Sequence, residues 1–507
     1  MAEMKHYTLG EYVKLLEEKG MLAEYNLQGK DGEEIKLLTY DSREVTQGTL
    51  FICKGAAFKA EYLKNSMNQG AVCYVSEKKY ELEKEVPYIL VKGIRDAMAV
   101  LANFFYNKPW EDLAVIGFGG TKGKSTSTYY MKAVVDDYLA AQDKPESAVI
   151  STIDIYDGKS KVESHITTPE AVELQMHLRN ALDCNIEYAE MEISSQALKY
   201  GRVDEMQFDV SVFLNISEDH ISPIEHPDFE DYFQSKMKMF EKSKIAVVNL
   251  DADYIDQILE ASKAAGEVVT FSTKNPEADY YAYNIHKEGK DIHFSVKCEA
   301  FDEEFVLTMP GFFNVENALG VVAASVKLGI PTEYIHSGLR RARSSGRMEF
   351  YHSKDHEVMA IVDYAHNKLS FEKLFSAMKE EFPDYGLVAI FGCPGKKSLL
   401  RRKYLGTIAG QYSKMVYLVA EDPGYEPVED ISKEIAQYVE AQKCPYKMIE
   451  DRGEAIKDAI ETAEGKTLLL VTGKGAETRQ KYGCEYLDCP SAVEYVQRYL
   501  AEYDSRH

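Results

Sequence analysis

No apolar run in the sequence approaches the length needed to span a bilayer, so we expect no membrane span. The first residues, MAEMKHYTLGEYVKLLEEKG, are charged and amphipathic, and they lack the apolar centre of a secretory signal. Prolines are few, at 15, and no low-complexity tract interrupts the chain. These absences predict a soluble, globular protein of the cytoplasm.

Basic residues are scarce as well. The 59 lysines and arginines face 83 acidic residues, which leaves a formal net charge of −24 at pH 7. Because a phosphate backbone selects basic surfaces, this balance argues against nucleic acid as a general partner. An acidic enzyme can still hold anions in local basic pockets, while most of the excess acid keeps the surface soluble.

The cysteines form no recognisable zinc or disulfide framework. The eight residues are scattered, and Cys484 and Cys489 are too isolated to form a metal site. Most of the others lie within apolar, strand-like runs. Buried free thiols in a reducing compartment are therefore the expected state.

A chain of 507 residues, 45% hydrophobic and 28% charged, is too long for one core and suggests about three domains. Breaks in the pattern fall at Asn107-Lys-Pro109 and at 341–346, with sequence RARSSG. We therefore predict an N-terminal domain at 1–110, a central domain at 111–345 and a C-terminal domain at 346–507.

In the second and third segments, apolar strand-like runs alternate with helical stretches, which predicts α/β domains with mainly parallel sheets. The runs are LAVIGF, AVIST, YAEMEI, VSVFLNI, IAVVNL and FVLTM, followed by VMAIVDY, LVAIFGC, MVYLVAE and TLLLVTG. Polar clusters follow seven of them: GGTKGKS, SSQ, SEDH, AHN, PGKK, EDPGYE and KGAE. Ligands collect at the carboxyl ends of such strands, so we expect the active site between the second and third segments.

The glycine-rich stretch at 119–125, GGTKGKS, lies between a predicted buried strand, Leu113 to Phe118, and a predicted helix, Ser125 to Tyr138. Backbone N–H groups of such a loop close around phosphate oxygens at a helix N-terminus. Lys124 would reach the β- and γ-phosphates, and Ser125 would offer an oxygen to Mg²⁺. The usual first glycine is replaced by Phe118. The predicted nucleotide contacts are Gly120, Thr121, Lys122, Gly123, Lys124, Ser125 and Thr126.

Four further residues or pairs carry two interpretations each. Glu192, after the YAEM run, is either a second Mg²⁺ holder or a solvated glutamate. His220 is either a ligand or a hydrogen-bonded structural residue. Thr167 and Thr168 are either a binding turn or a helix start, with Thr168 as the cap. Lys236 lies in an amphipathic stretch and is either functional or a snorkelling lysine.

Taken together, these motifs resemble the Mur ligases, and within them the branch that adds the third amino acid to the peptidoglycan precursor. The resemblance rests on GGTKGKSTSTYYM, ITTPEAVELQ, MEISSQALKYGRV, FDVSVFLNISEDHISPIEHPDFEDYFQSK, GFFNVENALG, GRMEF, VDYAHN and LVTGKGAETRQ, in that order. The N-terminal YDSREVTQGTLFICKGAAFKAEYL is similar to the uridine-diphosphate-binding domain of that branch. The resemblance covers nearly the whole chain.

The resemblance implies a three-domain, monomeric ligase that uses ATP and Mg²⁺. The γ-carboxylate of D-glutamate in UDP-N-acetylmuramoyl-L-alanyl-D-glutamate would become an acyl phosphate, which the incoming α-amine attacks. The implied catalytic and metal-binding positions are Lys124, Ser125, Glu192, His220 and Lys236, the last as a carbamate. The implied ATP contacts beyond the loop are Asn314, Arg347, Asp363 and His366. The implied contacts of the uridine dipeptide are Ser42, Thr167, Thr168, Ser194 and Arg202.

The incoming amino acid is expected to be L-lysine. Diaminopimelate-adding members carry Asp-Asn-Pro-Arg, whereas this chain has Glu421-Asp-Pro-Gly424, which lacks the arginine that grips a distal carboxylate. The acidic residues Glu421, Asp422, Glu426 and Glu477 suit an ammonium group, and Lys397 would meet the α-carboxylate. The pattern is also typical of lysine-adding members, with ornithine unresolved.

Other interpretations remain open at this point. The acceptor could be diaminopimelate or ornithine, or the chain could resemble the folate-polyglutamate ligases that share the central domain, although the uridine motif argues against the last. A catalytically silent nucleotide-binding regulator of wall synthesis is a third class. Retention of Lys124, Ser125, Glu192, His220 and Lys236 argues against it.

Overall fold

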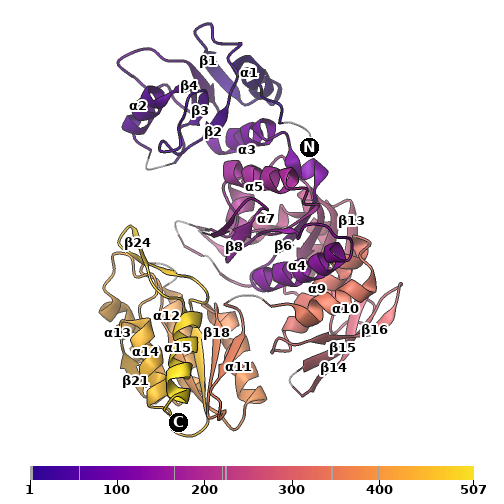
Figure 1. Ribbon diagram of the computed structural model, residues 1–507, viewed down its shortest axis with the longest axis vertical. Coiled ribbons are helices and arrows are strands. Elements are labelled where there is room, and N and C mark those ends of the chain that lie inside the picture. Colours follow the sequence, from indigo (N-terminus) through magenta and orange to yellow (C-terminus); the bar gives the residue numbers. More distant parts are fainter. Residues whose placement is uncertain are drawn as a thin grey trace.

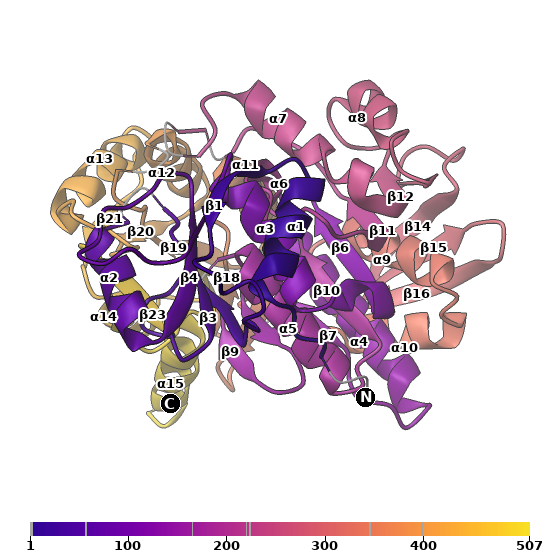
Figure 2. The same ribbon diagram turned by 90° about the horizontal axis from the view of Figure 1, so that it is seen from above.

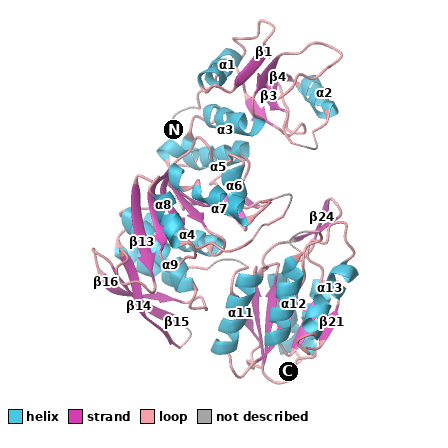
Figure 3. Cartoon of the chain, turned by 180° about the vertical axis from the view of Figure 1, so that it is seen from behind, coloured by secondary structure: helices cyan, strands magenta, loops and turns pink. Residues whose placement is uncertain are grey.

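A computed structural model describes residues 4–55, 58–164, 166–219, 221–222, 225–289, 291–343, 346–396 and 399–506. Three α/β units follow one another along the chain, as Figure 1 shows, and the same units appear from behind in Figure 3. The predicted α/β class with a mainly parallel central sheet is confirmed. Within the described residues, no helix combines the length and apolarity that crossing a membrane requires.

The first unit is a five-stranded sheet in the order β1-β5-β4-β3-β2, in which only β1 and β5 pair antiparallel. Its closing helix packs on α5 of the next unit, so the two units share a helix–helix contact. The elements are α1 Leu9–Glu18, β1 Leu22–Asn26, β2 Leu37–Thr39, β3 Thr49–Ile52, α2 Ala60–Gln69, β4 Ala71–Ser76, β5 Tyr88–Val91 and α3 Ile94–Phe105.

The central unit carries the largest sheet, in the order β16-β15-β14-β13-β12-β11-β6-β10-β7-β8-β9. The strands from β14 to β7 pair parallel, and both edges are antiparallel. The strands are β6 Ala114–Gly119, β7 Ala148–Ile150, β8 Asp154–Tyr156, β9 Lys161–Glu163, β10 Tyr188–Glu192, β11 Phe208–Phe213, β12 Ser243–Asn249, β13 Glu267–Ser272, β14 Tyr280–Glu288, β15 Asp291–Lys297 and β16 Asp302–Leu307. The helices are α4 Lys124–Ala140, α5 Ala171–Asp183, α6 Ser195–Lys199, α7 Phe229–Met237, α8 Ile255–Ser262, α9 Asn314–Lys327 and α10 Thr332–Arg341, with 3-10 turns at Pro109–Asp112 and Phe240–Lys242.

One strand prediction was wrong in direction. The FVLTM run was predicted to belong to the parallel set, but β16 pairs antiparallel with β15, which pairs antiparallel with β14. The connections between these three strands are too short for a crossover helix, which a parallel pair requires. The central sheet therefore ends in a three-stranded meander.

The third unit is a six-stranded sheet in the order β17-β18-β22-β19-β20-β21, parallel apart from β17, with a separate hairpin of β23 and β24. Its strands are β17 Glu349–His352, β18 Val358–Asp363, β19 Gly386–Phe391, β20 Met415–Leu418, β21 Tyr446–Met448, β22 Thr467–Thr472, β23 Arg479–Tyr482 and β24 Glu485–Asp488. Its helices are α11 Lys368–Glu381, α12 Leu400–Tyr412, α13 Val428–Glu440, α14 Arg452–Glu461 and α15 Ala492–Asp504. Seen from above in Figure 2, β19–β21 and the β14–β16 meander lie on opposite sides of the molecule.

A buried acid in the central sheet makes the stability of the fold depend on pH. Burial raises the pKa of Glu190, on β10, from 4.5 to about 8, and the charge of Lys132 opposes the shift. Between pH of about 5 and 8 the folded chain keeps this proton, whereas the unfolded chain has lost it. The free energy of unfolding should therefore fall as pH rises through this window. The loss is at most roughly 1.4 kcal/mol for each unit by which the two pKa values differ.

The variant Glu190→Gln tests this expectation. It should flatten the dependence of unfolding free energy on pH in that window, whereas Glu61→Gln, on the exposed face of α2, should leave it unchanged. Chemical denaturation at a series of pH values measures the difference. Parallel pH profiles for wild type and Glu190→Gln would show that Glu190 ionises normally in the folded chain.

Candidate active site

The phosphate loop connects β6 to α4, and two of its glycines are required by close packing. Gly120 has φ +140°, and a Cβ there would lie 3.2 Å from the backbone of Asn215. Gly123 has φ +86°, and a Cβ there would lie 2.2 Å from Asn317 Oδ1. These conformations favour glycine, so the loop can turn sharply into the N-terminus of α4. Phe118 is completely buried on β6, which explains why a phenylalanine replaces the usual first glycine.

The loop is held from below by residues that follow β11. The Thr121 N–H donates to the Asn215 carbonyl at 3.0 Å, and the Lys122 N–H donates to Asn215 Oδ1 at 2.8 Å. The Ser217 N–H donates to Thr121 Oγ1 at 3.0 Å, and this hydroxyl also lies 2.9 Å from the Tyr232 hydroxyl. Asn215 was not predicted as part of the site, although it lies in the VSVFLNI run singled out in the sequence.

A pair of oxygen donors lies at the start of α4. Ser125 Oγ donates to Glu192 Oε1 at 2.8 Å, and the same carboxylate oxygen accepts the Thr152 N–H at 2.8 Å. Glu192 is almost completely buried, which excludes its interpretation as a solvated glutamate. A buried carboxylate and a hydroxyl are the hard oxygen donors that Mg²⁺ prefers, so the two residues fit such an ion. His220 lies outside the described residues.

Basic side chains converge on the same loop. The Lys124 ammonium donates to the carbonyls of Gly120 and Thr121 at 3.1 and 3.3 Å, and Arg347 Nη2 donates to Ser125 Oγ at 3.1 Å. Burial lowers the pKa of Lys124, and it lowers that of Lys122 to about 8. Such a concentration of half-buried positive charge is costly unless an anion is bound, which favours phosphate as the ligand.

Lys236 is buried rather than snorkelling. Its side chain extends from α7 under the loop, and Nζ donates to the Gly120 carbonyl at 2.8 Å. Burial, followed by the charge of Lys124, lowers the pKa of Lys236 well below its usual value. Burial and the neighbouring cation therefore disfavour the charged ammonium and favour the neutral amine, which is the nucleophilic form.

The threonine turn is not a helix cap. The helix α5 begins at Ala171 after Glu170, so Thr168 does not cap it. Instead Thr168 Oγ1 donates to the Glu192 carbonyl at 2.9 Å and lies 3.1 Å from Ser194 Oγ. Thr167 Oγ1 accepts from Thr152 Oγ1 at 3.2 Å, so both threonines lie beside the oxygen pair.

A chain of polar contacts runs from here to the N-terminal unit. Arg202 Nη1 donates to the Thr168 carbonyl at 3.1 Å, and Nη2 pairs with Glu170 at 2.8 Å. Glu170 also pairs with Lys54 of the N-terminal unit at 2.5 Å. Ser42 lies in the loop after β2, beside Tyr40, which donates to Glu173 on α5. The predicted dipeptide contacts Thr168, Ser194 and Arg202 are therefore connected to Lys54 of the N-terminal unit.

Asp219 joins the central and C-terminal units. This carboxylate is 93% buried (7% exposed), and it pairs with Lys122 Nζ at 3.4 Å and with Arg401 of α12 at 3.0 Å. It also accepts from the Asn367 amide, the N-cap of α11. Asp219 and Asn367 belong to the SEDH and AHN clusters singled out in the sequence, whereas no sequence signal pointed to Arg401.

Three of the predicted ATP contacts outside the phosphate loop lie around a narrow cavity of about 100 Å³ between α4, α9 and the end of β18. Asn314, Arg347 and Asp363 line it. Asp363 accepts the Met348 and Ala365 N–H groups at 3.0 and 2.8 Å. His366 lies on the loop side of β18, where Nδ1 donates to the Tyr364 carbonyl at 2.7 Å and burial lowers the pKa of His366 well below its usual value.

A larger pocket of about 460 Å³ lies between the central unit and the ends of β19, β20 and β22. Asp422 and Glu477 line it, together with Glu421. Asp422 is already paired with Lys474 at 2.9 Å, and burial raises the pKa of Glu421 to about 7. Lys397 lies outside the described residues.

The acidic cluster proved smaller than predicted. The Glu426 carboxylate is held by Arg402 at 2.7 Å and by the Lys396 N–H at 2.8 Å, and Glu426 does not line the pocket. Glu477 accepts the Gly475 N–H at 2.6 Å, and no cation of the described chain lies within ion-pair distance of its carboxylate. Of the four predicted acids, Glu477 is therefore the best placed to receive a cationic ligand.

The phosphate loop and the oxygen pair of Ser125 and Glu192 lie in the central unit, and a second pocket lies between this unit and the C-terminal one. This arrangement is typical of a nucleotide-dependent enzyme that joins two substrates. The Mur ligase middle domain matches residues 119–325, and the Mur ligase glutamate ligase domain matches residues 346–475. The chain belongs to the Mur ligase family, as its sequence motifs predicted.

Proteins of similar sequence match this chain over most of their length. The chain is 38% identical over 456 residues to the UDP-N-acetylmuramoyl-L-alanyl-D-glutamate–L-lysine ligase of Enterococcus faecalis, and the alignment covers 88% of each chain. It is 31% identical over 519 residues to the UDP-N-acetylmuramyl-tripeptide synthetase of Lactobacillus acidophilus, which covers 98% of each.

Solved structures share the fold at low identity. A UDP-N-acetylmuramoyl-L-alanyl-D-glutamate–2,6-diaminopimelate ligase has a TM-score of 0.65 at 22% identity, over 98% of this chain and 100% of that one. The MurF ligase of Thermotoga maritima in complex with ADP has a TM-score of 0.61 at 18% identity, over 93% and 99%.

Proposed function

We propose that this protein is a cytoplasmic, monomeric ligase that uses ATP to join L-lysine to UDP-N-acetylmuramoyl-L-alanyl-D-glutamate. The observation that carries the proposal is the meeting of three features at the end of β10. The phosphate loop, under which the amine of Lys236 is buried, reaches Glu192 through Ser125. The polar contacts from Lys54 through Glu170 and Arg202 reach Glu192 through Thr168. The lysine-ligase names of the 38%-identical relatives support the choice of substrates.

The chemistry follows from what a carboxylate needs to become an electrophile. A γ-carboxylate oxygen of D-glutamate attacks the γ-phosphorus of ATP, the bond to ADP breaks, and an acyl phosphate forms. The α-amine of lysine then attacks the acyl carbon and loses a proton, and the tetrahedral intermediate releases phosphate. Such transfers depend on positioning and charge neutralisation rather than on a covalent group of the protein.

The described residues have separate parts in this reaction. Lys124, Lys122 and Arg347 neutralise phosphate charge around the loop, and the narrow cavity beside Asn314 and Asp363 receives the nucleoside. Ser125 and Glu192 would hold Mg²⁺, together with Lys236 as a carbamate. When bound, this ion withdraws charge from the transferring phosphoryl group.

The carbamate follows from the state of Lys236. A neutral amine adds to the carbon of CO₂, a C–N bond forms, and one proton is released. The product is an anion with two oxygen atoms in place of the amine. Because burial lowers the pKa of Lys236, the neutral amine that this addition needs is favoured.

One assay separates the candidate functions. Purified protein with ATP, Mg²⁺ and the uridine dipeptide is offered L-lysine, L-ornithine or meso-diaminopimelate, and phosphate release is measured. We expect release with L-lysine above the others. Release with diaminopimelate alone would contradict the acceptor assignment, and release with none would favour a silent nucleotide-binding regulator.

Glu477 is expected to contact the side-chain ammonium of lysine. Glu477→Gln keeps an oxygen for the Gly475 N–H but removes the charge, so KM for lysine should rise by about 10–100-fold, the equivalent of a charge-assisted hydrogen bond. KM for ATP should not change. Glu485→Gln, on the exposed strand β24, is the control. An unchanged KM for lysine in Glu477→Gln would place the ammonium elsewhere.

Asp219→Asn should separate binding from turnover. Removing the charge shared by Lys122 and Arg401 loosens the contact between the two units, so kcat should fall by about 10²-fold, the equivalent of the ~3 kcal/mol lost when a buried ion pair is broken. ATP affinity, measured by calorimetry, should hold because positive charge at the loop is retained. A weaker ATP affinity with unchanged kcat would contradict this role. Asp384→Asn, exposed before β19, is the control.

A further inference from the structure

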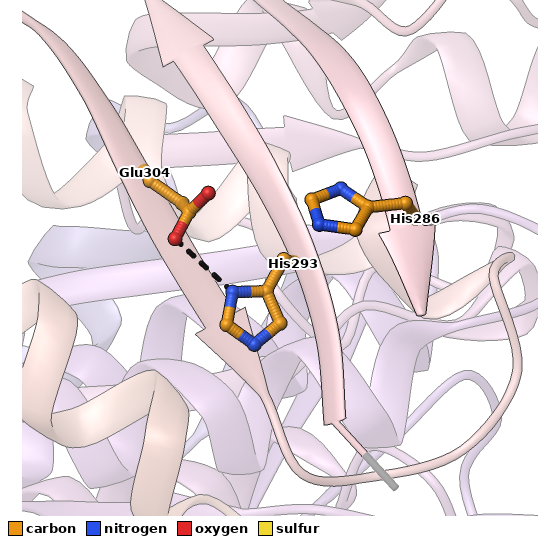
Figure 4. A group of neighbouring side chains, drawn as sticks. All are labelled: His286, His293 and Glu304. Atoms are coloured by element: carbon orange, nitrogen blue, oxygen red, sulfur yellow. Dashed lines mark hydrogen bonds and ion pairs between the residues drawn. The ribbon is translucent and has the colours of Figure 1, made fainter. Parts of the chain in front are cut away.

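The antiparallel meander at the edge of the central sheet gathers two histidines and a glutamate on one face. His286 on β14 pairs directly with His293 on β15, and Ser295, two residues further along β15, pairs with Glu304 on β16. Residues opposite each other or two apart on a strand project to the same face. Figure 4 shows the three side chains side by side on neighbouring strands.

This face is the outer one. The other face of the meander carries Ile292, Phe294, Val296 and Phe305, all buried in the core. His286 and Glu304 are exposed and His293 is half-buried, so solvent reaches the cluster. One ligand atom from each of the three residues lies within 4.8 Å of the others.

The ring of His286 is already held in one orientation. His286 Nδ1 lies 2.8 Å from the Asn284 carbonyl, which can only accept, so Nδ1 carries the proton and Nε2 presents its lone pair. Asn284 has φ +50° and lies where the β14–β15 register shifts, and such bulges re-aim side chains. A ring nitrogen anchored on a backbone carbonyl is the usual support of a metal-binding histidine.

The third ligand and a neighbouring carboxylate complete the set. His293 Nδ1 lies 3.1 Å from Glu304 Oε1, and its Nε2 lies 3.7 Å from Glu288 Oε2. In a tetrahedral zinc site with bonds of about 2.0–2.2 Å, neighbouring ligand atoms are roughly 3.3 Å apart. Glu304 is exposed, so its side chain can turn toward the two imidazoles while His286 keeps its bond to the Asn284 carbonyl.

We propose that His286, His293 and Glu304 form a binding site for a divalent transition-metal ion of the zinc class. Two imidazoles and one carboxylate select zinc, nickel or cobalt over Mg²⁺, which prefers oxygen ligands, so the ion is distinct from the one that the phosphate loop would hold. Because the ligands come from three strands, the bound ion would cross-link the strands of the meander.

This cross-link has a structural consequence for the contact between the meander and the C-terminal unit. Lys287, next to His286 and on the opposite face, pairs with Glu381 at the end of α11 at 3.2 Å. Glu381 also accepts the Gly311 N–H at 3.2 Å. A metal ion bound by His286 on the outer face would therefore fix β14, the strand from which Lys287 reaches Glu381.

The test is a zinc titration of the purified full-length chain, freed of metal and kept in excess Mg²⁺ with a phosphine reductant. Competition with a chromophoric chelator should show one equivalent of zinc bound. His286→Ala and His293→Ala should each weaken it by about 10-fold or more. Zinc should also raise the melting temperature of wild type but not of these variants.

Two controls keep the result specific. His336 pairs with Glu303 at 2.7 Å but does not belong to the proposed cluster of ligands. Zinc binding should therefore be unchanged in His336→Ala. Cobalt bound in place of zinc should show no thiolate charge-transfer band, which excludes the cysteines. No stoichiometric binding, equal affinity in His286→Ala and His293→Ala, or a thiolate band would each overturn the site.

Discussion

Replacing Lys236 by alanine is expected to reduce turnover by about 10³-fold or more, a loss comparable to removing a principal charge-stabilising group. The amine is buried under the phosphate loop, where it donates to the Gly120 carbonyl, so no other described side chain substitutes for it. Initial rates of phosphate release at saturating substrates measure the loss. Lys238→Ala, exposed two residues further on, should retain full activity.

The same variant separates a carbamate from a plain lysine. If Lys236 acts as a carbamate, acetate or propionate should restore part of the activity of Lys236→Ala by supplying a carboxylate in the vacated space. ¹³CO₂ should also give a carbamate carbon signal in wild type that is missing in the variant. Full activity in Lys236→Ala would remove this residue from the mechanism, and a loss that no short carboxylate relieves would favour the unmodified amine.

Replacing Glu192 by glutamine should have the second large effect. Glutamine keeps an oxygen for the Ser125 hydroxyl and the Thr152 N–H, so the loop should remain in place while the charge that faces Mg²⁺ is lost. We expect turnover to fall by about 10²–10³-fold and the Mg²⁺ concentration for half-maximal rate to rise.

The measurement is a Mg²⁺ titration of the rate, with thermal melting to show that the fold is intact. Glu187→Gln, exposed just before β10, is the matched control and should behave as wild type. Loss of rate with an unchanged Mg²⁺ dependence would mean that Glu192 positions the loop and does not hold the ion.

Local patterns in the sequence predicted much of the fold. The apolar runs of β6, β10, β11 and β12 are long and buried on both faces, so hydrophobicity alone marked them as strands of a parallel sheet. The β14–β16 meander was missed as a unit because alternation predicts a strand but not the direction of its partner.

The site was predicted less completely because several of its contacts join distant segments. The phosphate loop is continuous in sequence, and its motif carried the prediction of Lys124 and Ser125. The ion pair of Asp219 with Arg401 spans 182 positions, and no local pattern encodes it. The interpretation of Lys236 as a snorkelling lysine was wrong because amphipathic spacing does not reveal what packs over the helix end.

The central claim is that ATP phosphorylates the γ-carboxylate of the dipeptide before lysine attacks. The direct test uses uridine dipeptide labelled with ¹⁸O in that carboxylate, with ATP and L-lysine, and mass spectrometry of the released phosphate. Because a carboxylate oxygen becomes the bridging oxygen of the acyl phosphate and leaves with phosphorus, we expect one ¹⁸O in each phosphate formed with tripeptide. Tripeptide accompanied by unlabelled phosphate would contradict the account.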